Sequence, residues 1–140
     1  MKWIVNDENE LKYVVPRLLE FIPKMGVVLL EGQMGAGKTT LIRNILSLLT
    51  VDDFQGSPTY SIVHEYLSKD CHPIYHFDLY RLDSHEELAS IGFEEYIYNN
   101  SLSLIEWPEK SLKFLPENRI WVYIRVNEEN QRIIEIKNDN

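Results

Sequence analysis

The ten residues Glu31–Thr40, "EGQMGAGKTT", place three glycines and a lysine between two segments of different character. The preceding run "VVLL" (27–30) is continuously apolar, which is typical of a strand buried on both faces. The following segment "LIRNILSLL" (41–49) repeats apolar residues at helical spacing. The sequence therefore predicts a strand, a glycine-rich loop and a helix in direct succession.

The loop fits the pattern G-x-x-x-x-G-K-[ST] from Gly32 to Thr39. Glycine lets the backbone turn tightly and approach a ligand closely, and successive amides in such a turn form a nest for an anion. The next helix adds its free N-terminal amides and the positive end of its dipole. An ordinary glycine-rich turn is the alternative, but the flanking strand and helix are what phosphate binding requires. We therefore predict a nucleotide site.

Side chains as well as amides are expected to bind this nucleotide. Lys38 should reach the β- and γ-phosphates, and the hydroxyl of Thr39 should ligate a Mg²⁺ ion that bridges them. The residues that we expect to contact the nucleotide from this segment are Gly32, Met34, Gly35, Ala36, Gly37, Lys38, Thr39 and Thr40.

Two carboxylates end apolar strand patterns and are candidates to complete the site. "LSLIE" (102–106) ends in Glu106, where a phosphate-loop protein places the acidic partner of its metal. "IYHFD" (74–78) ends in Asp78, on the same strand face as Ile74 and His76. The alternative for either carboxylate is a strand end that faces water. The residues alone do not divide the roles of metal ligand and water-positioning group between Asp78 and Glu106.

Thr59 and Trp107 are further candidates for the same site. Thr59 lies in "GSPTY" (56–60), a loop stiffened by Pro58, where its hydroxyl could meet the γ-phosphate as switch segments do. A plain turn explains that loop equally well. Trp107 follows Glu106 directly and could pack beside the nucleotide, although covering a hydrophobic edge is the commoner role of tryptophan.

The remaining segments predict further strands and short helices around the loop. "KWIV" (2–5) is a strand candidate, and a helix with one apolar face should follow a cap at Asn6 or Asp7. "SIVHEYLS" (61–68) and "PIYHFDLYR" (73–81) alternate on either side of a polar turn, which predicts an antiparallel hairpin. Residues 83–100 read as one or two helices, with Ser84 as cap and Gly92 as break. Residues 119–137 read as two strands about "NEEN" (127–130).

Composition limits the class of protein. The 140 residues suit one domain, 1–140, and the single cysteine excludes an internal disulfide and fits a reducing cytoplasm. The N-terminus lacks the apolar core of a signal peptide, and the apolar runs are far shorter than the roughly 20 residues that cross a bilayer. The net charge of −8 makes the chain a poor partner for nucleic acid on its own. We expect a soluble cytoplasmic protein that binds neither membrane nor DNA.

Four blocks of the sequence together resemble the TsaE family, the small ATPases needed to make threonylcarbamoyladenosine in bacterial tRNA. In the family's order and spacing they are "GQMGAGKTT" (32–40), "SPTY" (57–60), "HFDLYR" (76–81) and "IEWPE" (105–109). The family's loop more often carries Asp and Leu where this chain has Gln33 and Met34. Because the loop works through backbone amides, that difference puts little in doubt.

The resemblance implies an α/β fold of the P-loop NTPase type, a three-layer domain with a mixed, mainly parallel central sheet and an antiparallel hairpin. It implies ATP and Mg²⁺ as cofactors and slow hydrolysis of the ATP. Lys38 and Thr39 would take the phosphate and metal roles, and Glu106 would be the acidic partner of the metal. Asp78 would matter for hydrolysis, and Thr59 would lie in a switch-like loop.

The resemblance also implies two partner proteins that form the threonylcarbamoyltransferase, so that tRNA is reached only indirectly. A small-molecule kinase is the main alternative, but such kinases usually carry a lid with several arginines, and the six arginines of this chain are scattered. A GTP-binding switch is disfavoured because the sequence has no N-K-x-D segment to recognise guanine.

Overall fold

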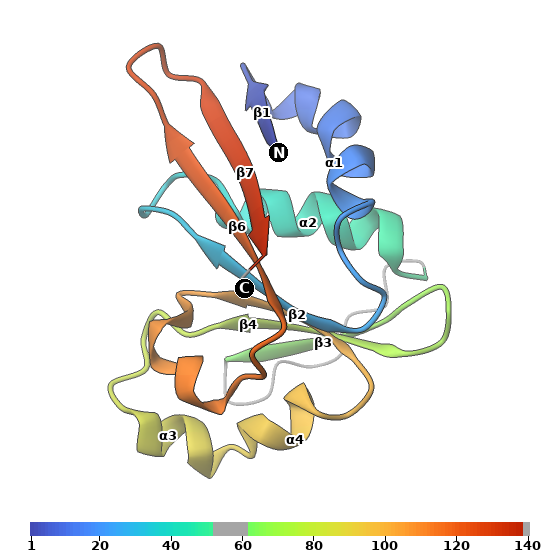
Figure 1. The fold of residues 1–140 in the computed structure, drawn as a ribbon, viewed down its shortest axis with the longest axis vertical. Coiled ribbons are helices and arrows are strands. Elements are labelled where there is room, and N and C mark those ends of the chain that lie inside the picture. The colour runs from blue at the N-terminus through green and yellow to red at the C-terminus, as the bar shows by residue number, and fades with distance from the viewer. Residues whose placement is uncertain (52–61, 139–140) are drawn as a thin grey trace.

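A computed structural model describes residues 1–51 and 62–138, and its centre is a seven-stranded sheet (Figure 1). The strands are β1 (Lys2–Val5), β2 (Gly26–Glu31), β3 (Val63–Leu67), β4 (Pro73–Asp78), β5 (Leu102–Glu106), β6 (Arg119–Val126) and β7 (Arg132–Asn138). The helices are α1 (Leu11–Leu19), α2 (Lys38–Leu49), α3 (His85–Ser90) and α4 (Phe93–Ile97), with short 3₁₀ turns η1 (Glu8–Glu10), η2 (Pro108–Lys110) and η3 (Leu112–Phe114).

The sheet is parallel at its centre and antiparallel toward both edges. Its strand order is β1-β7-β6-β2-β5-β4-β3. The neighbours β6, β2, β5 and β4 run parallel to one another, whereas β1, β7 and β3 run antiparallel to the strands beside them. The hairpins β3–β4 and β6–β7 are the two that the sequence predicts. The expected mixed sheet is therefore confirmed, with its parallel pairing in the centre.

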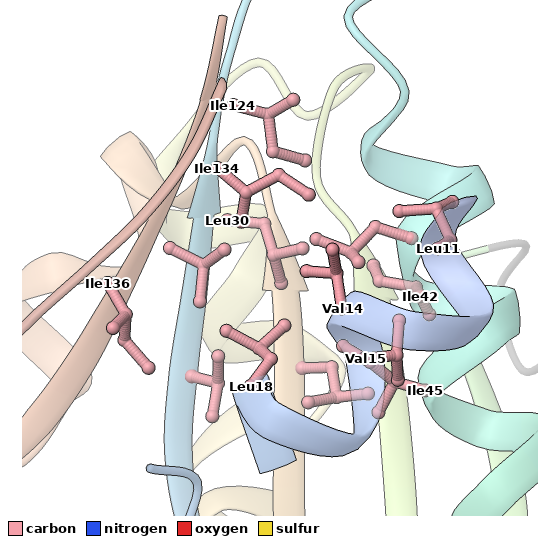
Figure 2. Packing of buried hydrophobic residues seen from close by; sticks show 14 of the residues in the cluster. Leu11, Val14, Val15, Leu18, Leu30, Ile42, Ile45, Ile124, Ile134 and Ile136 are labelled. Atoms are coloured by element: carbon pink, nitrogen blue, oxygen red, sulfur yellow. The ribbon is translucent and has the colours of Figure 1, made fainter. Parts of the chain in front are cut away.

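Helices cover both faces of the sheet and complete three layers (Figure 1). On one face, Leu18 of α1 and Ile45 of α2 meet Leu30 of β2 and Ile134 of β7 (Figure 2). On the other face, α3 and α4 pack on β4 and β5, with the ring of Phe93 set edge-on to the ring of a buried β4 phenylalanine, centroids 5.0 Å apart. The three-layer α/β arrangement thus follows from two separate apolar clusters on a sheet buried on both sides.

Short polar signals set where the helices begin and end. The side chain of Asp7 accepts from the amide of Glu10 at 3.2 Å, as the predicted cap requires. The side chain of Ser84 accepts from the amide of Glu87 at 3.3 Å, at the start of α3. Gly92 has a φ of +75° between α3 and α4, so the segment forms two helices with the break where the sequence predicts it.

Among the residues that the structure describes, no helix combines the length and the apolar character needed to cross a membrane.

Two buried serines, Ser101 just before β5 and Ser103 within it, allow a matched test of stability. Among the described residues, the hydroxyl of Ser103 has no hydrogen-bond partner, whereas the hydroxyl of Ser101 donates to the carbonyl of Tyr96 at 2.9 Å. We expect Ser103→Ala to keep or raise the free energy of unfolding, because an unsatisfied buried hydroxyl costs about 1 kcal/mol or more. Ser101→Ala should lower it by about 1 kcal/mol. Urea unfolding measures the free energy of unfolding of both variants. Equal decreases would contradict the difference in hydrogen bonding between the two hydroxyls.

Candidate functional site

The carboxyl ends of three parallel strands meet at one edge of the sheet. The glycine-rich loop follows β2, Asp78 ends β4 and Glu106 ends β5. Glu106 lies level with Leu30 of β2 on one side and with Asp78 of β4 on the other. In open α/β sheets ligands bind beyond the carboxyl ends of the strands. The pairing therefore brings both predicted carboxylates to the loop.

Glycines shape the loop in two different ways. Gly35 and Gly37 have φ values of +83° and +107°, a left-handed region that other residues rarely adopt. Gly32 is needed for a close approach, since a Cβ there would lie 2.6 Å from the carbonyl oxygen of Ile124 in β6. Gly37 is also the N-cap of α2. The amides of the first turn of α2 therefore begin directly after the turn and point away from the helix.

The side chain of Lys38 folds back over the loop. It is 5% exposed, and its Nζ donates to the carbonyl of Gly32 and, at 3.3 Å, to the carbonyl of Gln33. The same ammonium lies 3.7 Å from the centroid of the Trp107 ring, a cation–π contact. Lys38 therefore stands inside the loop, at the position that the motif assigns to it.

The charge state of Lys38 is set by two opposed effects. Burial lowers the pKa of Lys38, because a desolvated ammonium is disfavoured. Nearby carboxylates oppose that change, since each negative charge favours the protonated amine. These carboxylates belong to Glu106, Glu109, Asp78 and Glu31. Negative charge thus surrounds the one buried lysine of the loop.

Glu106 is the most enclosed carboxylate of the site. It is 3% exposed, and both of its oxygens have partners. Oε1 accepts from the Thr39 hydroxyl at 2.9 Å, and Oε2 lies 2.6 Å from Nε2 of His76. Sequence reasoning places His76 on the correct face of β4 but assigns it no partner. The hydroxyl and carboxylate that the sequence predicts as metal ligands are therefore in direct contact.

Asp78 and Trp107 flank an open cleft beside the loop. The cleft has a volume of about 340 Å³ and is lined by Lys38, Thr39, Asp78, Tyr80, Glu106, Trp107 and several loop residues. Asp78 is exposed, and its Oδ1 accepts from the amide of Tyr80 at 3.1 Å. Trp107 has a φ of +56°, and its ring lies 5.0 Å from that of Tyr80. The predicted residues Asp78 and Trp107 thus share one cleft with Lys38 and Thr39.

A second recess also adjoins the loop. It has a volume of about 310 Å³, and its walls include the turn 6–8 before α1, Gly35–Gly37, Thr40 and Arg132 of β7. The Arg132 guanidinium donates to the carbonyls of Ala36 and Gly35, both at 3.4 Å. Sequence reasoning missed Arg132, because a single arginine in an alternating strand has no motif. Only the β1–β7–β6 pairing brings it to the loop.

The other predicted site residues have differing positions. Met34 is 64% exposed at the tip of the loop, whereas Ala36 is buried beneath it. Thr40 lines both the cleft and the recess. Thr59 lies outside the described residues, so its role stays a prediction.

Known proteins resemble this chain over most of its length. The family model described as threonylcarbamoyl adenosine biosynthesis protein TsaE matches residues 5–134. The tRNA threonylcarbamoyladenosine biosynthesis protein TsaE of Rickettsia felis is 38% identical, over 95% of this chain and 77% of its own. The protein of the same name from Bacillus subtilis is 31% identical, over 96% of this chain and 83% of its own.

A solved structure resembles the fold as well. YdiB from Bacillus subtilis superposes with a TM-score of 0.76 at 27% identity, covering 100% of this chain and 86% of that chain. The range matched by the family model, residues 5–134, includes the loop, both strand-end carboxylates, β6 and the first residues of β7. The chain therefore belongs to the TsaE family of threonylcarbamoyladenosine biosynthesis proteins.

Proposed function

We propose that this protein binds ATP with Mg²⁺ and hydrolyses it slowly, in support of partner proteins that make threonylcarbamoyladenosine in tRNA. The observation that carries the proposal is the gathering of Lys38, Thr39 and Glu106 around one glycine-rich loop. Each of these groups has a distinct task in binding a metal triphosphate. The TsaE names of the relatives supply the biosynthetic setting.

The loop supplies the phosphate contacts. Its main-chain amides and the N-terminus of α2 offer donors without a competing side chain, because Gly35 and Gly37 have none. Lys38 already donates to two loop carbonyls, so its ammonium is held at the loop before any phosphate arrives. Phosphate oxygens would exchange for these carbonyls at short range. This exchange needs little movement of the lysine.

The oxygen pair of Thr39 and Glu106 fits Mg²⁺. Mg²⁺ takes oxygen ligands at 2.0–2.1 Å in an octahedron, whose adjacent ligands are about 2.9 Å apart. Thr39 Oγ1 and Glu106 Oε1 are separated by 2.9 Å. Within the described residues no group of three or more His, Cys, Asp or Glu side chains could hold a metal. The remaining ligands would therefore be phosphate and water oxygens, and the bound ion would neutralise phosphate charge.

Asp78 is the best placed group to orient water. It is exposed in the cleft and lies level with the metal-facing carboxylate of Glu106 on the neighbouring strand. One oxygen is fixed by the Tyr80 amide, which leaves the carboxylate anchored but accessible. A carboxylate in this position can accept a hydrogen bond from a water molecule and, later, its proton. We assign hydrolysis to Asp78 and metal binding to Glu106.

The recess beside Arg132 suits the nucleoside part of ATP. It adjoins Gly35–Gly37 and Thr40, so a ligand with its phosphates in the loop could extend into it. Its apolar wall includes Leu41 and Ile134, and its rim carries polar groups of the turn before α1. Flat bases usually occupy apolar clefts with a few polar groups at the rim. The first helix and the C-terminal hairpin thus remain the expected base-binding elements.

The setting of the activity is a larger assembly. The net charge of −8 disfavours direct binding of tRNA, which partner proteins would hold instead. ATP in the loop would order nearby segments, and a docked protein could sense that order. Phosphate release from ATP alone should therefore be slow and should change when the partners are added. Rapid phosphorylation of a small metabolite without any partner would instead favour the kinase alternative.

Removing the Lys38 ammonium should weaken nucleotide binding. We expect Lys38→Ala to lower the affinity for Mg²⁺·ATP at least about tenfold, because a charge-assisted contact to phosphate contributes about 1.5–3 kcal/mol. Isothermal titration calorimetry measures the affinity. Lys24→Ala is the control, since Lys24 is exposed and pairs with Asp70 away from the loop. Unchanged ATP affinity in Lys38→Ala would contradict the site.

Substitutions at Asp78 and Glu106 should have different effects, because we assign the two residues different roles. Asp78→Asn should slow phosphate release by about 100-fold while leaving ADP affinity close to wild type, because it removes a proton acceptor. Glu106→Gln should weaken the Mg²⁺ dependence of nucleotide binding and slow turnover. The midpoint of denaturant unfolding should be the same for both variants as for the wild-type protein, within the error of the measurement. Wild-type turnover of either variant would remove that residue from the site.

A further inference from the structure

We propose that His76 is a positioning residue that holds Glu106 in its metal-binding orientation, an inference that rests on the proposed function. Nε2 of His76 lies within hydrogen-bond distance of Oε2 of Glu106, at 2.6 Å. That bond leaves Oε1 directed at the Thr39 hydroxyl, 2.9 Å away. His76 itself need not touch nucleotide or metal. It acts through the carboxylate that does.

The strand geometry makes His76 well suited to this task. Its side chain lies on the same face of β4 as Asp78, and Glu106 at the end of β5 lies level with Asp78. The imidazole therefore reaches the carboxylate diagonally across one face of the sheet, and His76 is not among the residues that line the cleft. The side chain of His76 is only 12% exposed and that of Glu106 only 3%. Water has little access with which to replace this hydrogen bond.

The hydrogen bond also fixes which nitrogen of His76 carries a proton. An ionised carboxylate only accepts hydrogen bonds, so Nε2 must be the donor. The ring of His64 lies on the other side, with its centroid 6.0 Å from that of His76 and its backbone directly opposite on β3. His64 thus limits the space into which His76 could turn. The described contacts of Glu106 do not include His64.

The bond matters because it fixes the orientation of a buried carboxylate. Without a partner on Oε2, Glu106 would be free to rotate about its last torsion. Such rotation would oppose a metal that requires near-ideal octahedral geometry. Residues behind a metal ligand commonly change metal affinity by about 10–100-fold when they are replaced. We expect His76 to fall in that range.

Asparagine and glutamine at position 76 form a matched pair for the test. Glutamine can place an amide donor near the position of Nε2, whereas asparagine is too short to reach Oε2. We expect His76→Asn to lower the apparent Mg²⁺ affinity of the ADP-bound protein by about 10–100-fold. Its ADP affinity in EDTA should stay at the wild-type value. His76→Gln should restore much of the loss, and His64→Asn should stay near wild type. Calorimetric titrations of ADP, with Mg²⁺ or with EDTA, supply these numbers.

A spectroscopic measurement keeps the inference testable even if His76→Asn unfolds. Long-range ¹H–¹⁵N spectra of the wild-type protein report which ring nitrogen carries the proton. We expect His76 to be protonated at Nε2, with and without Mg²⁺·ADP. A ring protonated only at Nδ1 would overturn the inference, because the carboxylate would then have no donor there.

The failures of the inference and of the proposed function can be told apart. If wild-type protein binds ADP more tightly with Mg²⁺ and folded His76→Asn does the same to the same extent, the inference is wrong and the function stands. If wild-type protein shows no Mg²⁺-dependent binding of ADP, both are wrong. Loss of ADP affinity in EDTA by folded His76→Asn would also overturn the inference, because His76 would then act on the loop and not through the metal ligand.

Discussion

The parallel register of β2, β5 and β4 is the constraint on which the site depends. It sets Glu106 level with Leu30, one residue before the end of β2, and level with Asp78. A slip of one residue in β5 would turn Glu106 to the opposite face, toward α3 and α4. The carboxylate would then lose both Thr39 and His76. The apolar side chains of β5 pack into both core clusters, on opposite faces of the sheet. The packing of these clusters therefore opposes such a slip and keeps Glu106 beside the loop.

The loop is shaped by segments that lie far from it in sequence. Gly32 presses against the backbone of β6, and Arg132 of β7 holds the carbonyls of Gly35 and Ala36. On the other side, Trp107 covers the ammonium of Lys38. The C-terminal hairpin and the segment after β5 therefore hold the loop between them. Its conformation is a property of the whole sheet edge, and the motif alone does not set it.

Sequence patterns predict those parts of this protein whose structure depends on interactions between residues close together in the chain. The loop, the caps at Asp7 and Ser84, the break at Gly92 and both hairpins follow from spacing, turn chemistry and side-chain hydrogen bonds to nearby amides. Strand order depends on pairing between segments that are distant in the chain, so the sequence does not predict it. The position of Arg132 beside the loop follows from that order and is not predicted either. The bond between His76 and Glu106 spans 30 residues and needs the β4–β5 register.

The charge around Lys38 gives a physical reason for the proposed metal. Four carboxylates act on this lysine, and the chain as a whole carries a net charge of −8. A bare triphosphate would meet repulsion from these carboxylates, which Lys38 and the guanidinium of Arg132 would offset only in part. A divalent cation held by Glu106 would supply positive charge that offsets this repulsion. Under the proposed function, the same carboxylates that discourage a free anion would favour a metal-bound one, and Mg²⁺ would be a condition of tight nucleotide binding.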